Sequence, residues 1–150
     1  MISKKTKYAL KALVALAEDY GRHQPLLISA LAKKEKIPQK FLEVILLELK
    51  NYGMLQSKKG KGGGYSLARS PERIQLGNVM RVLEGPLAPL PCLSQTAYQK
   101  CDDCRDEETC AVRIAMKDLQ EATAKILDRT NLQDMIERVK NQTSASMYFI

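Results

Sequence analysis

The sequence predicts a mainly α-helical protein with a small β-hairpin: a winged helix-turn-helix domain followed by a long C-terminal helix. Three observations support this prediction. Two amphipathic helical segments meet near residue 37. A run rich in lysine and glycine follows them between two strand-like segments. An apolar repeat of helical period then extends from residue 110 to residue 129.

The distribution of charge is as informative as its total. Residues 1–75 carry 15 Lys and Arg against 6 Asp and Glu, and residues 76–150 carry 9 against 11, so the net charges are +9 and −2. A basic N-terminal half indicates that this end meets a polyanion. The chain has no secretory leader and no apolar run of about 20 residues, so we expect a cytoplasmic protein without a membrane partner.

The N-terminal half contains three predicted helices. Residues 4–20 have apolar side chains at helical period, and Ser29 is a suitable N-cap for a second helix over 30–36. Pro38 fits the first turn of a third helix over 38–52, where its missing N–H costs nothing. The apolar face of this third helix contains Phe41, Leu42, Ile45, Leu46 and Leu49. Phe41 and Leu42 are expected to pack it against the core.

Two strands, over 54–57 and 65–68, flank a tip that is rich in lysine and glycine. Phosphate-binding loops of nucleotide hydrolases and dinucleotide-binding loops need a helix after the glycines, and Arg69-Ser70-Pro71 prevents one. After a helix-turn-helix, such a hairpin is a DNA-contacting wing, and glycine lets the backbone approach phosphates closely. The alternative is a flexible, solvated loop. The candidate DNA-contacting residues of the tip are Lys58, Lys59, Lys61, Gly62, Gly63 and Gly64.

The C-terminal half is predicted to contain a short helix over 78–83, a long helix over 110–129, a final short helix over 131–140 and a frayed tail. We divide the chain into a DNA-binding domain (1–85), a cysteine-containing sensor loop (86–110) and a dimerisation helix with its tail (111–150). The long helix either packs on its own domain or forms a dimer seam, and we favour the seam. Its apolar stripe contains Val112, Ala115, Met116, Leu119, Ala122, Ile126 and Leu127.

Four cysteines stand within 19 residues, as Cys92-x8-Cys101-x2-Cys104-x5-Cys110, among several carboxylates. Four thiolates in one loop can hold an iron–sulfur cluster or a tetrahedral zinc ion. The spacing matches neither a zinc ribbon nor a ferredoxin. A disulfide switch and unliganded thiols remain as alternatives.

Several ordered motifs resemble the Rrf2 family of bacterial transcription regulators. They are Tyr8-Ala9-Leu10-Lys11-Ala12-Leu13, Phe41-Leu42-Glu43, Leu49-x3-Gly53-Met54-Leu55, Lys59-Gly60-x2-Gly63-Gly64-Tyr65 and Leu76-Gly77-x-Val79-x2-Val82-x-Glu84-Gly85. The resemblance implies a homodimer that binds a palindromic operator in double-stranded DNA and is joined through the long C-terminal helix. By position, it assigns recognition-helix contacts to Gln39, Lys40 and Glu43.

For the sensing members of the family, the resemblance implies a [2Fe–2S] or related cluster held by three cysteines and one further ligand. Cys92, Cys104 and Cys110 match the three cysteines. Cluster-binding members place a histidine three residues after the last cysteine, where this chain has Arg113, and the extra Cys101 is the candidate fourth ligand. Zinc, or no metal, is the alternative.

We therefore expect a homodimeric DNA-binding regulator that senses iron–sulfur, redox or nitric oxide status through its cysteine loop, and not an enzyme. The alternatives are a small thiol- or metal-dependent oxidoreductase, a cluster-free regulator of cysteine or sulfur metabolism, and a protein-interaction module. Val44 and Lys59 replace a glutamine and an arginine of cluster-binding members, which suggests a different operator.

Overall fold

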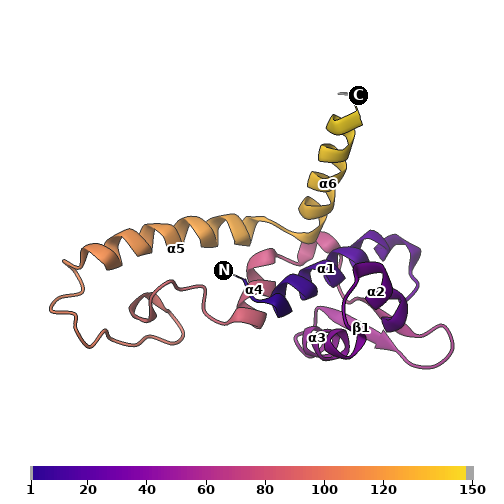
Figure 1. The fold of residues 1–150 in the computed structure, drawn as a ribbon, viewed down its shortest axis with the longest axis horizontal. Helices are drawn as coiled ribbons and strands as arrows, with labels where there is room; N and C mark the ends of the chain where they lie inside the picture. Colours follow the sequence, from indigo (N-terminus) through magenta and orange to yellow (C-terminus); the bar gives the residue numbers. More distant parts are fainter. Residues whose placement is uncertain (1, 148–150) are drawn as a thin grey trace.

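The computed structural model of the chain describes residues 2–147. It contains six α-helices and one two-stranded antiparallel hairpin, connected by three short 3₁₀ turns at η1 (Tyr20–Arg22), η2 (Pro71–Arg73) and η3 (Pro91–Leu93). Figure 1 shows a body formed by α1–α4 and the hairpin, from which α5 and α6 extend. The predicted fold class is confirmed. No helix within these residues combines the length and the apolar content needed to cross a bilayer.

Helix α1 (Lys4–Glu18) lies at the centre of the core. The Ser3 hydroxyl accepts a hydrogen bond from the backbone N–H of Thr6 at 3.1 Å, which satisfies one of the free donors at the start of the helix. The buried face of α1 contacts α3, α4 and α6. This face contains Thr6, Ala9, Ala12, Leu13, Ala15, Leu16 and Ala17.

The helix-turn-helix consists of α2 (Ile28–Glu35) and α3 (Gln39–Asn51). The predicted cap at Ser29 is wrong, because α2 begins at Ile28, two residues before its predicted start, and Leu27 occupies the N-cap position without a side-chain hydrogen bond. Lys36 ends α2 in the left-handed region at φ 54°, and the chain then turns through Pro38 into α3. Leu42, Ile45, Leu46 and Leu49 are fully buried, as expected. Phe41 is 37% exposed, and its ring forms an edge-to-face pair with Tyr8.

The hairpin pairs β1 (Leu55–Lys58) with β2 (Gly64–Leu67), and Leu55 lies opposite Leu67. Each strand is displaced by one residue from the prediction. Leu26 forms an additional bridge with Tyr65, through backbone hydrogen bonds of 2.8 and 2.9 Å in the two directions. The segment between α1 and α2 thus supports the back of the hairpin.

Helix α4 (Leu76–Glu84) begins two residues before its predicted start. Two backbone hydrogen bonds connect the start of α4 to the turn between α5 (Ala111–Arg129) and α6 (Leu132–Met147). They run from the N–H of Leu76 to Thr130 and from the N–H of Leu132 to Ile74, and together they form an antiparallel bridge between Gln75 and Asn131. The C-terminal end of α5 is therefore fixed to the winged helix.

Helix α6 is longer than predicted. It continues to Met147, so the expected frayed tail is helical up to that residue, and residues 148–150 lie outside the described part. Leu132 and Ile136 in its first turns are buried in the core against α1, whereas residues 137–147 are exposed and project away from the body (Figure 1). The boundaries predicted after residues 85 and 110 stay predictions.

Glu84, at the end of α4, holds the start of α1 in place, because its Oε1 accepts a hydrogen bond from the backbone N–H of Ser3 at 2.7 Å. Hydrogen bonds from Thr6 and Ser3 lower the pKa of Glu84 to about 2. Its contribution to stability is therefore complete above pH 4.5 and is lost as the pH falls toward 2. Because the Glu84 carboxylate is exposed, we expect it to contribute only about 1 kcal/mol to the free energy of unfolding.

We predict that Glu84→Gln loses less stability than the wild type between about pH 4.5 and pH 2.5, the range over which the carboxylate is protonated. Urea unfolding at a series of pH values measures this difference. Asp118→Asn, on the exposed side of α5, is the control and should follow the wild-type profile. Identical pH profiles for Glu84→Gln and the wild type would contradict the assigned role.

Candidate DNA-binding surface and cysteine loop

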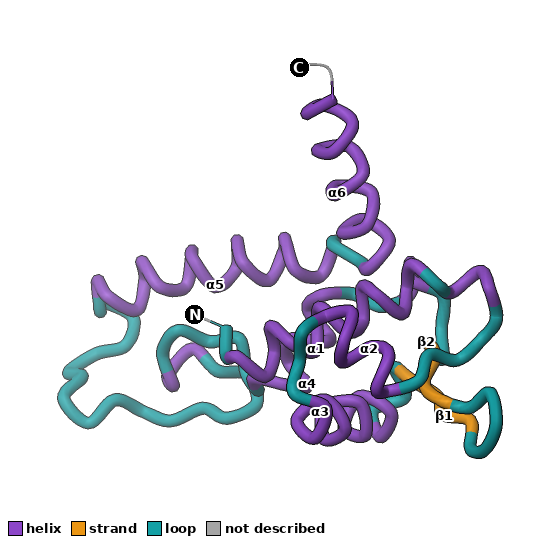
Figure 2. Tube along the Cα trace, turned by 45° about the vertical axis from the view of Figure 1, so that its right-hand side comes forward, coloured by secondary structure: helices purple, strands orange, loops and turns teal. Residues whose placement is uncertain are grey.

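Helix α3 and the hairpin lie on the side of the molecule away from α5 and α6, in both views of Figures 1 and 2. On α3, the predicted contact residues Gln39, Lys40 and Glu43 are all exposed. The Gln39 amide nitrogen donates to the Glu43 Oε1 at 3.2 Å, so these two side chains share one face of the helix. The structure brings them together as a polar edge that is free of contacts with the core.

The wing tip exposes all three predicted lysines, Lys58, Lys59 and Lys61. Gly60 and Gly62 have φ of 86° and 73°, which residues with a Cβ rarely adopt. The Lys50 ammonium at the end of α3 donates to the Ser57 Oγ of β1 at 2.7 Å. This bond connects the recognition helix to the wing, so that the two elements form one surface.

Gly63 and Gly64 have a structural role, and Gly63 is buried, so their DNA contacts stay a prediction. A Cβ on Gly63 would lie 2.3 Å from the Lys58 carbonyl oxygen, and one on Gly64 would lie 2.1 Å from the Leu26 carbonyl oxygen. Gly63 also closes the tip by donating its N–H to the Gly60 carbonyl at 3.0 Å. Only glycine lets the tip fold this tightly against the bridge that Leu26 forms with the hairpin.

The cysteine loop runs beneath α5 as the longest irregular segment of the chain (Figure 2). All four cysteines are free and line one cavity of about 470 Å³. Cys92 is buried in η3, Cys110 occupies the N-cap position of α5, and Cys101 is exposed. Within residues 2–147, no three Cys, His, Asp or Glu side chains lie close enough together to hold a metal ion. Metal binding therefore requires the loop thiols to converge further.

The loop raises the pKa of two of its thiols. The Cys101 thiol donates a hydrogen bond to Asp103 at 2.8 Å, which raises the pKa of Cys101 and lowers that of the carboxyl. Partial burial, followed by the nearby Cys110, raises the pKa of Cys104. Without a metal these thiols are thus kept protonated, and a bound cation would reverse that balance.

Arg113 lines the same cavity and has an unusual environment. Its Nε is buried and has no hydrogen-bond partner among the described residues. The closest carboxylate oxygen is Glu107 Oε2 at 3.8 Å, and the other oxygen of Glu107 accepts from the Tyr98 hydroxyl at 2.5 Å. Arg113 is thus paired with Glu107 by charge, but its buried Nε–H has no hydrogen-bond acceptor among the described residues and suits an anionic group in the cavity. A set of four thiolates is such a group, so the residues present fit an iron–sulfur cluster.

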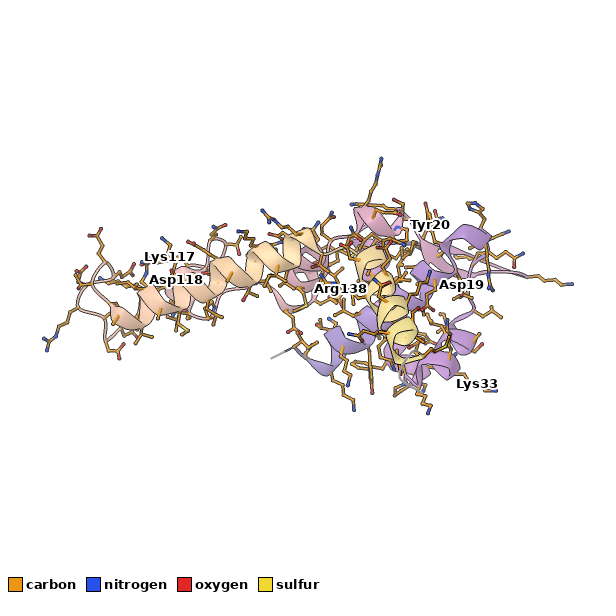
Figure 3. All side chains as sticks on the ribbon, turned by 90° about the horizontal axis from the view of Figure 1, so that it is seen from above. Asp19, Tyr20, Lys33, Lys117, Asp118 and Arg138 are labelled. Carbon is orange, nitrogen blue, oxygen red and sulfur yellow. The ribbon has the colours of Figure 1, made fainter. Side chains whose placement is uncertain are left out.

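The outer face of α5 is apolar and uncovered. Leu119 and Ile126 are 53% and 62% exposed; Val112 is 61% exposed and also lines the cysteine cavity, and Met116 and Leu127 are half-buried. Lys117 and Asp118 project from the same helix into solvent (Figure 3). The predicted stripe is therefore partly exposed, with Leu119 and Ile126 as its least covered members beyond the cysteine cavity.

Sequence reasoning missed the contact that joins α5 to α4. Arg81 and Asp128 form a two-pronged ion pair at 2.6 and 2.9 Å, which lies over Gly77. A Cβ on Gly77 would come 2.0 Å from the Asp128 Oδ1. No signal in the sequence indicated this contact, because Gly77 stood just before the predicted helix and a residue pair 47 positions apart leaves no local pattern.

Comparison with known proteins identifies the family. A family model named Rrf2, described as an iron-dependent transcriptional regulator, matches residues 2–138. An rrf2-like helix-turn-helix regulator of Rhodobacter capsulatus is 43% identical over 138 residues, 91% of this chain and 92% of that protein. The transcriptional regulator CymR of Bacillus subtilis is 30% identical over 149 residues, 99% of both proteins.

The structure of CymR, named the global cysteine regulator of B. subtilis, superimposes with a TM-score of 0.77 at 29% identity and covers 92% of this chain and 97% of that one. These relatives are transcriptional regulators, which excludes the oxidoreductase alternative. The chain belongs to the Rrf2 family of DNA-binding, winged-helix transcriptional regulators.

Proposed function

We propose that this regulator is a cytoplasmic homodimer that binds a palindromic operator and alters its affinity when the cysteine loop senses iron–sulfur, redox or nitric oxide status. One observation carries the proposal. Helix α5 has the cysteine cavity at its N-terminal end and, at its C-terminal end, the Arg81–Asp128 pair and the backbone contacts to the winged helix. A change in the loop is thus connected to the DNA-binding domain through a single rigid element.

Cys92, Cys104 and Cys110 are the proposed ligands of an iron–sulfur cluster, with [2Fe–2S] as the proposed type and Cys101 as the fourth ligand. The free Nε of Arg113 supports this assignment, because a guanidinium lowers the cost of gathering four thiolates in one cavity. When bound, the cluster supplies a redox-active and nitric-oxide-reactive centre. The cysteines of the loop and Cys110 at the start of α5 would hold it.

A cluster-free regulator of cysteine or sulfur metabolism is the second candidate. It is favoured by the similarity to CymR, whose structure is described as that of a global cysteine regulator. In this case the thiols of the loop have no metal to bind and sense by oxidation alone. Metal and sulfide analysis of protein purified without oxygen separates the two candidates.

The DNA-binding surface predicts a strong salt effect. Replacing Lys58, Lys59 and Lys61 by alanine should weaken binding to any duplex, because these exposed ammonium groups lie on the wing. The slope of log K against log salt concentration should flatten by roughly 0.9 for each phosphate that the wing no longer neutralises. Binding isotherms at several salt concentrations measure the slope.

The matched control removes the same charge from elsewhere. Lys125, Arg138 and Lys140 are exposed on α5 and α6, and Figure 3 shows Arg138 on α6. Their replacement by alanine should leave the salt slope close to that of the wild type. If both triple variants have the wild-type slope, the wing does not contact phosphates.

A further inference from the structure

The recognition helix exposes two large aliphatic side chains that the core does not use. Val44 is 60% exposed and Leu47 is 52% exposed. Other residues make the contacts of α3 with the core: Leu42, Ile45, Leu46 and Leu49 are fully buried. Residues three apart lie on the same face of a helix, so Val44 and Leu47 form a continuous apolar strip on the outer face.

Polar and basic side chains surround this strip. Lys40 lies one turn before Val44, and Glu43, which bonds Gln39, lies one turn before Leu47. Beyond the strip, Lys50 connects α3 to the wing, whose tip carries the exposed lysines. The surface is therefore apolar at its centre, and its margins carry the lysines of α3 and the wing together with the Gln39–Glu43 pair.

A DNA major groove complements that arrangement. Its margins are phosphates, which attract the lysines, and its floor offers one apolar group, the C5-methyl of thymine. A protein partner with an apolar patch would leave the basic margins without a counterpart. The charge complementarity selects duplex DNA as the occupant.

We propose that Val44 reads a thymine in each half of the operator by packing its methyl groups against the thymine C5-methyl, with Leu47 excluding water beside this contact. The contact supplies sequence specificity that the polar residues Gln39, Lys40 and Glu43 do not provide. It rests on the operator binding proposed above and is independent of the cysteine loop.

The test removes the methyl group from the DNA. Full-length wild-type protein first selects its operator from random duplexes, and each thymine is then replaced singly by deoxyuridine, which lacks only the C5-methyl. At one position in each half-site, replacing thymine by deoxyuridine should weaken wild-type binding about fourfold. This is the equivalent of about 0.8 kcal/mol for one buried methyl. Val44→Ala should bind the thymine and deoxyuridine operators equally well.

Val139→Ala is the control, since Val139 is 59% exposed on α6 and lies far from α3. It should retain the fourfold discrimination. The proposal is overturned if Val44→Ala still discriminates at the same position, or if no thymine of the operator is sensitive. Selection of no operator by the wild type would overturn both this proposal and the operator binding on which it rests.

Discussion

Leu119→Asp is expected to convert the protein into a monomer that no longer holds its operator. Leu119 lies in the middle of the exposed apolar face of α5, between Val112 and Ile126. In the proposed dimer, a carboxylate at this position would be buried without a partner, which costs several kcal/mol. Two half-sites about 34–36 Å apart need two linked recognition helices. Without the link, operator affinity should fall by roughly 10²–10⁴-fold.

Sedimentation equilibrium and operator titration together measure this result. Val139→Asp introduces the same charge at an equally exposed valine on α6 and should remain dimeric with normal operator affinity. A wild-type protein that is already monomeric at micromolar concentration would refute the proposed dimer interface on α5. A Leu119→Asp variant that remains dimeric would place the interface elsewhere.

The helical periodicity of α5 was predictable, but which of its apolar side chains are buried was not. Apolar spacing identifies a helix with an apolar stripe, and the long helix was predicted within one residue of its start. Met116 and Leu127 are half-buried, whereas Leu119 is exposed. That difference depends on which side of the helix the rest of the chain covers. No local pattern in the sequence specifies that side.

The errors at element ends have a similar origin. Ser29 has a strong intrinsic preference for a helix cap, yet α2 starts before it. Leu26 pairs with Tyr65 of the hairpin, and this long-range contact fixes the path of the chain just before α2. Tertiary contacts of this kind override a local preference and cannot be recognised from neighbouring residues alone.

The candidate site was more predictable than its surroundings. Charge, glycine content and cysteine spacing located the wing lysines and the cysteine loop, because these residues act through their chemical type. Arg113 and the Arg81–Asp128 pair were missed as structural features, since their importance comes from burial and from contacts with distant residues. Arg113 pairs with Glu107 of the loop, and the Arg81–Asp128 pair joins α5 to α4.

We expect replacement of the cysteines to have the largest effect on the metal content of the protein. Wild-type protein purified without oxygen should contain iron and acid-labile sulfide, with visible absorption. Cys110→Ser should lose most of both, because thiolates bind these metals far better than hydroxyls do. Cys110 is the N-cap residue of α5, where serine is a favoured residue, so the helix should start normally in this variant. Thr109→Ser, with its hydroxyl able to keep the bond to Asp106, is the neighbouring control.

Metal loss should also alter DNA binding, because the cavity lies at one end of α5 and the Arg81–Asp128 pair at the other. A tenfold change in operator affinity requires only about 1.4 kcal/mol of coupling between the two states of the loop. Serine variants of Cys92, Cys101 and Cys104, analysed in the same way, identify the ligand set. Zinc without sulfide would refute the iron–sulfur cluster but retain a metal site. No metal in any preparation, together with unchanged DNA binding in every serine variant, would leave the cysteine loop with a structural role alone.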